Sequence, residues 1–227
     1  MILFMKVNFI EDNCNIVNSG QFNMDYDLSM LDFAIENKID YAYVRFYQWY
    51  PACISLGRHQ KTDCYIDLGL DVVKRVSGGR ALLHDRELTY CIVAPIFKES
   101  IIESYKDISR ALIKGFSKLG VELDFAKNEN KNLNYCMNIS SGADVAYNGK
   151  KFIGSAQFRK QGYLLQHGSI PYSLDFELIK KIFNQDVESE HIITLNEINQ
   201  NLSTAQIINA LKEGFVEIFK TIQIEQK

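Results

Sequence analysis

The fold of this chain is decided by one stretch, which reads Lys74-Arg75-Val76-Ser77-Gly78-Gly79-Arg80-Ala81-Leu82-Leu83-His84-Asp85-Arg86-Glu87-Leu88-Thr89-Tyr90. An apolar run over 70–73 leads into it and further apolar runs over 81–83 and 88–94 follow, which predicts three strands. Paired glycines after a strand let the backbone turn sharply and approach a ligand closely. Because Arg75 and Arg80 flank the glycines, we expect a carboxylate, a phosphate or a polarised carbonyl to bind there, although a plain β-turn with charged edges fits the same residues.

The spacing of apolar residues on either side of this stretch predicts strands interleaved with helices. The spacing of apolar residues predicts helices over 21–36, 63–69, 101–119, 175–184 and 203–221. Strands are predicted over 7–10, 41–46, 53–56, 143–147, 150–156 and 163–170, with Asn148-Gly149 as a hairpin turn and 159–162 as a second turn. This order indicates an α+β fold with a mostly antiparallel or mixed sheet flanked by helices.

The composition limits the classes of protein to which the chain can belong. Its 227 residues are 47% hydrophobic, which suits one domain over 1–227 with residues from about 175 onward as a helical C-terminal extension. The net charge of −3 argues against a general nucleic-acid binder. No apolar run reaches the ~18 residues of a membrane span, so we expect no membrane as a partner. Because of the net charge, we expect no nucleic acid as a partner either. No long apolar surface helix is evident, and we expect a monomer.

The cysteines point to a reducing compartment. There are 5 of them, scattered along the chain without a Cys-x-x-Cys pair. This pattern favours reduced thiols in the cytoplasm over a disulfide framework or a zinc site, and we expect no metal.

Cys136 and Lys151 are the candidates for covalent chemistry. Cys136 lies in a polar loop before a strand, where it is either a reactive thiol or a small apolar filler. Strand alternation places Lys151 on one face with Ile153 and Ser155. Lys151 is either a lysine at the hairpin edge or, if buried beside a cysteine, the acid–base partner of a nucleophile. His84 and His167 lie in strand-like runs and suit a site or the core equally well.

Several motifs occur in a characteristic order. The first helix carries Phe22-Asn23-Met24 and Asp27, and the next segment carries Arg45-Phe46-Tyr47, Trp49, Pro51, Ser55, Leu56, Gly57 and Gln60. The glycine loop and Glu87-Leu88-Thr89-Tyr90 follow, and then Gly154-Ser155-Ala156-Gln157-x-Arg159 and Gln166-His167-Gly168-Ser169-Ile170. Together they resemble the lipoate–protein ligase/octanoyltransferase superfamily, which shares its catalytic domain with biotin protein ligases. The resemblance implies that catalytic-domain fold.

Details within the motifs are similar to the octanoyltransferases of Gram-positive bacteria. Arg80 stands where ATP-dependent ligases commonly have a third glycine, and Cys136 precedes Lys151 by fifteen residues (151 − 136 = 15), as in those transferases. Departures include Val76 in the loop, Met137 after the cysteine and Leu28 in the first helix, and they concern substrate preference more than reaction class.

The resemblance implies acyl transfer in lipoate biosynthesis, with Cys136 and Lys151 as catalytic residues. Octanoyl-acyl carrier protein is the implied donor, Cys136 carries the octanoyl group as a thioester, and a lysine of a lipoyl domain such as the glycine-cleavage H protein is the acceptor. The implied substrate-binding residues are Arg75, Ser77, Gly78, Gly79, Arg80, His84, Gly154, Ser155, Ala156, His167 and Gly168. Leu82, Val73 and Ile153 are expected to line an acyl tunnel. No cofactor is expected, because the substrate carries its own phosphopantetheine thioester.

Three other functions fit the same residues. An ATP-dependent lipoate–protein ligase would use the pocket without needing Cys136. A lipoyl-domain amidotransferase would differ only in its donor protein. A non-catalytic acyl-binding protein would need neither Cys136 nor Lys151 for turnover.

Overall fold

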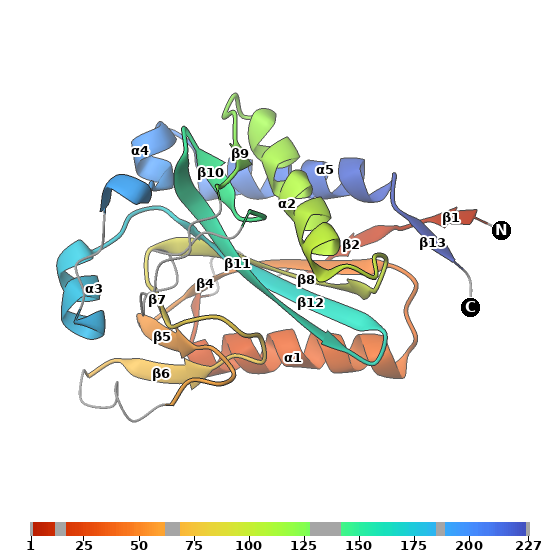
Figure 1. Ribbon diagram of the computed structural model, residues 1–227, viewed down its shortest axis with the longest axis horizontal. Helices are drawn as coiled ribbons and strands as arrows, with labels where there is room; N and C mark the ends of the chain where they lie inside the picture. Colours follow the sequence, from red (N-terminus) through yellow and green to blue (C-terminus); the bar gives the residue numbers. More distant parts are fainter. Residues whose placement is uncertain (1, 12–16, 62–68, 128–141, 185–188, 226–227) are drawn as a thin grey trace.

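The computed structural model describes residues 2–11, 17–61, 69–127, 142–184 and 189–225 (Figure 1). Its larger sheet contains, in spatial order, β2 (Val7–Phe9), β4 (Ala42–Trp49), β8 (Glu87–Pro95), β12 (Tyr163–Pro171), β11 (Lys150–Lys160), β10 (Val145–Tyr147) and β9 (Asp124–Phe125), with β3 (Val17–Asn18) paired to β4. The pairs along β4-β8-β12-β11-β10 are antiparallel, whereas β2 and β3 run parallel to β4. The predicted α+β class with a mixed sheet is confirmed.

Strand β8 shows why the sheet is covered on both faces. All of its residues from Glu87 to Ala94 are buried, and successive side chains of a strand point to opposite faces. Tyr90 and Ile92 belong to one apolar cluster, whereas Cys91 and Val93 belong to the other. An antiparallel strand buried on both sides requires a layer of structure above and below it.

Helices supply these two layers. On one face lie α2 (Ile101–Ser117) and α5 (Thr204–Phe219), which pack against each other and contribute Ile108, Phe116 and Phe215 to the core. On the other face lies α1 (Gly20–Glu36), which contributes Met30 and Leu31. The three layers are visible in Figure 1, where α1 runs below the sheet and α2 and α5 run above it.

A smaller sheet lies beside α1. It contains β6 (Asp71–Lys74), β5 (Cys53–Leu56) and β7 (Leu82–His84), with β5 parallel to β6 and antiparallel to β7. Helix α3 (Phe176–Phe183) covers it through Ile179, Ile182 and Phe183. The glycine loop, residues 75–80, connects β6 to β7, and its Ser77 Oγ lies 2.6 Å from His167 Nε2 on β12 of the larger sheet.

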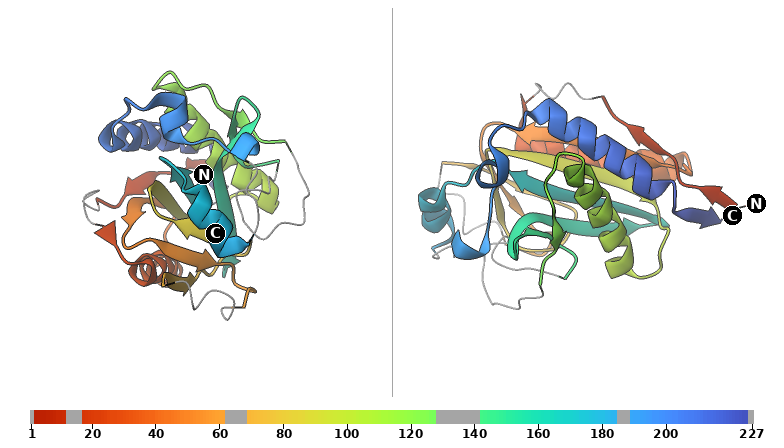
Figure 2. Two further views of the ribbon diagram at one scale, coloured as in Figure 1. Left: turned by 90° about the vertical axis from the view of Figure 1, so that its left-hand side faces the viewer. Right: turned by 90° about the horizontal axis from the view of Figure 1, so that it is seen from above.

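The remaining elements join the ends of the chain to this core. Strands β1 (Ile2–Phe4) and β13 (Gln223–Glu225) pair antiparallel, so the two ends of the described chain lie side by side (Figure 2). A short 3₁₀ helix (Ser189–His191) and α4 (Leu195–Asn199) lead into α5. None of the described helices has the length and apolar character that a membrane span requires.

Most predicted elements are confirmed, with shifted ends. The hairpin turn at Asn148-Gly149 has φ values of 50° and 80°, the left-handed pair that a type I′ turn requires. The predicted turn over 159–162 is wrong in its first half, because Arg159 and Lys160 still belong to β11 and Gln161-Gly162 makes the turn. The predictions missed β1, β3, β9, β13 and α4, which are too short for a periodic pattern. The predicted helix over 63–69 falls almost entirely outside the described residues.

Candidate active site

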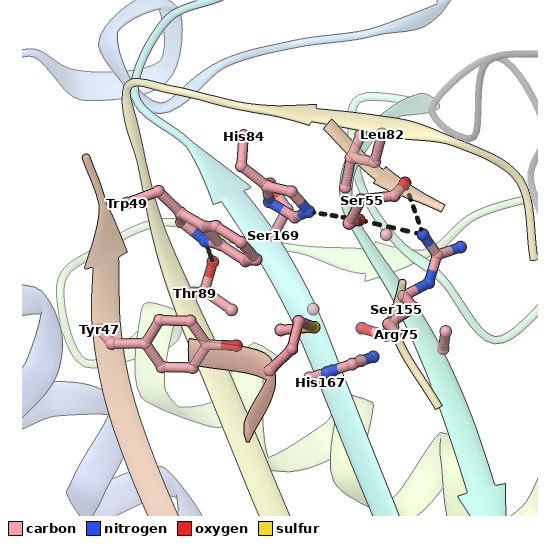
Figure 3. A pocket seen from close by; sticks show the side chains of 14 residues that line it. Tyr47, Trp49, Ser55, Arg75, Leu82, His84, Thr89, Ser155, His167 and Ser169 are labelled. Atoms are coloured by element: carbon pink, nitrogen blue, oxygen red, sulfur yellow. Dashed lines mark hydrogen bonds between the residues drawn. The ribbon is translucent and has the colours of Figure 1, made fainter. Parts of the chain in front are cut away.

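A pocket opens where the two sheets meet (Figure 3). Its empty space is about 380 Å³, part of it open to solvent. It is lined from α1, from both sheets and from the glycine loop by Met24, Tyr47, Trp49, Ser55, Arg75, Leu82, His84, Thr89, Gly154, Ser155, Ala156, His167, Gly168 and Ser169. Residues from almost every part of the fold thus converge on one space.

Two glycines allow the walls of this pocket to approach closely. A Cβ on Gly57 would stand 2.0 Å from the Gly79 carbonyl oxygen, so the chain after β5 touches the glycine loop directly. A Cβ on Gly168 would stand 2.2 Å from Ser155 Oγ and 2.6 Å from Tyr90 Cε1. Because real Cβ atoms do not tolerate such contacts, glycine is required at both positions.

Arg75 organises the glycine loop from inside. Its Nη1 donates to the Ser55 carbonyl and to Ser55 Oγ, each at 3.0 Å. Its Nε and Nη2 donate to the Gly78 carbonyl at 3.3 and 3.0 Å, and Nη2 also donates to the Arg80 carbonyl at 2.6 Å. These bonds occupy the guanidinium with protein acceptors. Arg75 therefore holds the loop against β5 in this structure.

One hydrogen-bonded relay runs behind the pocket wall from Glu87. His84 Nδ1 lies 2.8 Å from Glu87 Oε1, and His84 Nε2 lies 2.7 Å from Ser55 Oγ. Ser169 Oγ donates to Glu87 Oε2 at 2.6 Å, and the Thr89 hydroxyl donates to Glu87 Oε1. Burial by itself raises the pKa of the Glu87 carboxyl, but His84 and the hydrogen bonds from His84, Ser169 and Thr89 outweigh it and lower that pKa.

A second relay of the same kind starts from Asp27 on α1. His167 Nδ1 lies 3.1 Å from Asp27 Oδ2, and His167 Nε2 lies 2.6 Å from Ser77 Oγ of the glycine loop. Asp27 also accepts from Tyr47 Oη at 2.8 Å and from Arg45 Nη1 at 3.3 Å. These bonds tie α1, β4, β12 and the glycine loop together around the pocket.

Lys151 belongs to a third buried cluster, one step behind the pocket. Its Nζ lies 3.0 Å from Asp144 Oδ2, and the side chains of both residues are 5% exposed. Tyr105 Oη donates to Asp144 Oδ1 at 2.5 Å. Burial and the Asp144 carboxylate raise the pKa of Tyr105 well above its usual value, so this hydroxyl stays protonated. Ser155 donates its backbone N–H to Tyr105 Oη at 3.1 Å and thereby links the cluster to the pocket wall.

The sequence-predicted residues divide into three groups. Those that line the pocket are Arg75, His84, Gly154, Ser155, Ala156, His167, Gly168 and, for the tunnel, Leu82. Those that do not line the pocket are Ser77, Gly78, Gly79, Arg80 and Lys151, together with Val73 and Ile153, whose expected place in the tunnel wall is therefore wrong. Cys136 lies outside the described residues. Among the described residues, no group of His, Cys, Asp or Glu is arranged to hold a metal ion.

Sequence reasoning did not assign site roles to the carboxylates that support these side chains. Glu87, Asp27 and Asp144 are 3%, 1% and 4% exposed, which is rare for acidic residues unless they are paired. A signal was present for two of them, because Glu87 opens a run of apolar residues and Asp144 interrupts another. Trp49 was missed as well; its ring stacks on His84 with centroids 3.8 Å apart.

Comparison with known proteins gives consistent matches. A family model described as the lipoyl protein ligase A/B catalytic domain matches residues 19–216. A curated octanoyltransferase LipM from Lysinibacillus sphaericus is 34% identical, over 93% of this chain and 87% of the relative. Another octanoyltransferase LipM, from Clostridioides difficile, is 41% identical over 70% of this chain and 67% of the relative.

Solved structures share the fold at lower identity. Lipoate-protein ligase A bound with ATP superimposes with a TM-score of 0.72 at 19% identity, over 95% of this chain and 85% of that one. A bipartite lipoate protein ligase of Thermoplasma acidophilum, described with its E2 lipoyl domain, gives a TM-score of 0.68 at 19% identity, over 95% of this chain and 84% of that one. The predicted catalytic-domain fold is confirmed.

Proposed function

This chain belongs to the lipoyl protein ligase A/B catalytic-domain family, and on that premise we propose that it is an octanoyltransferase of lipoate biosynthesis. The observation that carries the proposal is the match to curated octanoyltransferases at 31 to 41% identity over most of the chain. The ligases among the solved structures are only 19% identical, so they support the fold and not ligase activity.

The pocket is the proposed site of the acyl chain. Apolar walls from Leu82, Met24 and the ring of Trp49 suit an alkyl chain, and burial contributes ~0.8 kcal/mol per CH₂ group. We propose octanoyl-acyl carrier protein as the donor, and a lipoyl domain such as the glycine-cleavage H protein as the acceptor. The T. acidophilum ligase described with an E2 lipoyl domain supports a lipoyl domain as the class of acceptor.

We propose that Cys136 carries the octanoyl group. Its thiolate would attack the donor thioester carbonyl, and the carrier thiolate would leave and take up a proton. The ε-amine of the acceptor lysine would then attack the enzyme thioester, lose a proton and form the amide, which regenerates the Cys136 thiolate. The two cysteines in the described part of the chain are unsuited to this role. Burial raises the pKa of Cys53 to about 12 and that of Cys91 well above its usual value.

Lys151 is the proposed acid–base partner. Its Nζ forms an ion pair with Asp144 at 3.0 Å, and a lysine ammonium can lower the pKa of a nearby thiol and supply the proton to the departing carrier thiolate. Such general acid catalysis contributes typically ~10²–10⁴-fold in rate. For the tetrahedral oxyanion, the Ser155 N–H is a poor candidate because it already donates to Tyr105. We propose the amides of the Gly78-Gly79 loop as its hydrogen-bond donors instead.

The test is intact mass spectrometry of the protein mixed with octanoyl-acyl carrier protein in the absence of ATP. We expect the gain of one octanoyl group that hydroxylamine removes, that persists in Cys53→Ala and that is lost in Cys136→Ser. Addition of an apo lipoyl domain should discharge the octanoyl group to that protein. An octanoylated lipoyl domain offered as donor in place of the carrier distinguishes an amidotransferase from a transferase.

Two outcomes would contradict the proposal. An octanoyl group that remains on Cys136→Ser would remove Cys136 from the mechanism. Lipoylation of the acceptor from free lipoate only in the presence of ATP, without any covalent octanoyl enzyme, would make the protein a ligase.

A further inference from the structure

Glu87 is the centre of the hydrogen bonding behind one wall of the pocket, although it does not line the pocket itself. Three residues that do line it, His84, Thr89 and Ser169, bond directly to its carboxylate. Two more are attached one step further out: Ser55 at 2.7 Å from His84 Nε2, and Trp49, whose Nε1 donates to Thr89 Oγ1 at 2.8 Å.

The charge of Glu87 sets the direction of every bond in this wall. An ionised carboxylate only accepts, so His84 Nδ1, Thr89 and Ser169 must all donate to it. In the neutral tautomer of His84 that donates from Nδ1 to Glu87, Nε2 accepts the hydroxyl proton of Ser55. The Ser55 oxygen is then free to accept from Arg75 Nη1, and the Thr89 oxygen is free to accept from Trp49.

The consequence is a wall of polar residues that presents almost no polar surface. Ser55, His84, Thr89 and Ser169 all line the pocket, yet their hydrogen-bond donors are directed at His84 and at Glu87. The bond between Ser55 and His84 is drawn in Figure 3. The described surface facing the cavity is accordingly almost wholly apolar. A ligand atom that needs a hydrogen-bond donor therefore finds none among the hydroxyls of Ser55, Thr89 and Ser169.

We propose that Glu87 is a positioning residue for substrate selection: it keeps this wall apolar, so that the site accepts saturated acyl chains and rejects chains with a polar group at the tail. The inference rests on the proposed function, in which this pocket holds the acyl chain. A hydroxyl buried there without a partner loses about 10- to 100-fold in affinity.

The conservative substitution Glu87→Gln tests this directly. A glutamine amide donates as well as accepts, so it cannot accept from His84, Thr89 and Ser169 at once. At least one polar group of the wall must then turn toward the pocket. The substrates are octanoyl-acyl carrier protein and the same carrier charged with 8-hydroxyoctanoate, whose added hydroxyl lies at the end of the chain.

We expect the wild-type protein to prefer the octanoyl donor by about 10- to 100-fold in kcat/KM. In Glu87→Gln this ratio should fall to within a few-fold, through a higher KM for octanoyl donor with a smaller change in kcat. Glu197→Gln is the matched control, because Glu197 makes a similar set of hydrogen bonds in the capping box of α4, away from the pocket. It should keep the wild-type ratio.

Ser55→Ala is a second test variant, assayed with the same two donors, that leaves Glu87 unchanged. It removes the partner of His84 Nε2 and leaves that acceptor facing the space where the hydroxyl stood. We expect improved use of the 8-hydroxyoctanoyl donor, and this variant keeps the proposal testable if Glu87→Gln does not fold.

Failure of this inference is separable from failure of the proposed function. A wild-type protein that transfers neither acyl group would overturn the octanoyltransferase assignment and this inference with it. Transfer of octanoate with an unchanged preference in both Glu87→Gln and Ser55→Ala would overturn only the role of Glu87. Equal losses with both donors would likewise show that Glu87 is merely structural.

Discussion

At the scale of single residues, the site depends on buried charges that are paired. Lys151 and Asp144 are both almost fully buried, and Lys151 Nζ lies 3.0 Å from Asp144 Oδ2. Each buried charge is therefore compensated by the opposite charge of its partner. Such a pair adds little net stability compared with apolar residues, but removal of one partner leaves a costly buried charge. The burial of this pair therefore suits a chemical role for the lysine.

Asp144→Asn should accordingly destabilise the protein through Lys151. We expect the free energy of unfolding to fall by about 3 kcal/mol, because the buried ammonium loses this counter-ion. Urea unfolding followed by circular dichroism measures the change. Lys151→Met added to Asp144→Asn should recover a substantial part of the loss, and a double variant no more stable than Asp144→Asn would contradict the argument.

At the scale of elements, the α2–α5 contact fixes the layer above the sheet. The two helices cross at Gly115 and Gly214, where a Cβ on Gly214 would stand 2.3 Å from the Ala111 carbonyl oxygen and 2.5 Å from the Gly115 nitrogen. Backbone therefore touches backbone at the crossing. The larger side chains on either side, including Phe116, Leu211 and Phe215, then reach the core of the sheet.

Gly214→Ala should destabilise the protein even though alanine favours a helix. The gain in helix propensity is about 1 kcal/mol, whereas forcing the helices apart disturbs the packed layer. We expect a net loss of about 2 kcal/mol in the free energy of unfolding, measured by urea titration. The control is Asn209→Ala on the exposed face of α5, which should be as stable as wild type or slightly more so. If Gly214→Ala were also neutral, the crossing would be looser than described.

At the scale of the whole molecule, two sheets, helix α1 and the glycine loop converge on one pocket, and buried carboxylates bond these parts to one another. Asp27 links α1 to β4 and β12, and Glu87 links β8 to β7 and β12. Because these bonds cross between elements, the protonation of such a carboxylate affects the stability of the entire fold.

The lowered pKa of Glu87 predicts a contribution to acid stability. A carboxyl whose pKa is lower in the folded state stabilises the fold above its ordinary value, here 4.5, and this contribution is lost as the pH falls through the folded-state pKa. The stability difference between wild type and Glu87→Gln should therefore be constant near neutral pH and narrow below about pH 4.5. Urea unfolding at a series of pH values checks this. A difference that stays constant into acid, or widens, would contradict it.

The sequence by itself determined the local elements. The apolar spacing of α1 and α2, the Asn148-Gly149 turn and the strands around the glycine loop are all encoded by neighbours along the chain, and the structure confirms them. The motifs also sufficed to identify the family, because they occur in a fixed order.

Which side chains of the site are hydrogen-bonded to one another depends on the tertiary structure. Ser77 and His167 are 90 residues apart, as much as 140 residues separate Asp27 from His167, and Ser55 and His84 come from strands paired across a loop. Hydrophobic periodicity reports whether a position is buried, but it carries no information about which distant residue lies opposite. For that reason the sequence shows only that Glu87 opens one apolar run and that Asp144 interrupts another. Their roles as buried acceptors for other side chains are apparent only when the sheets pack together.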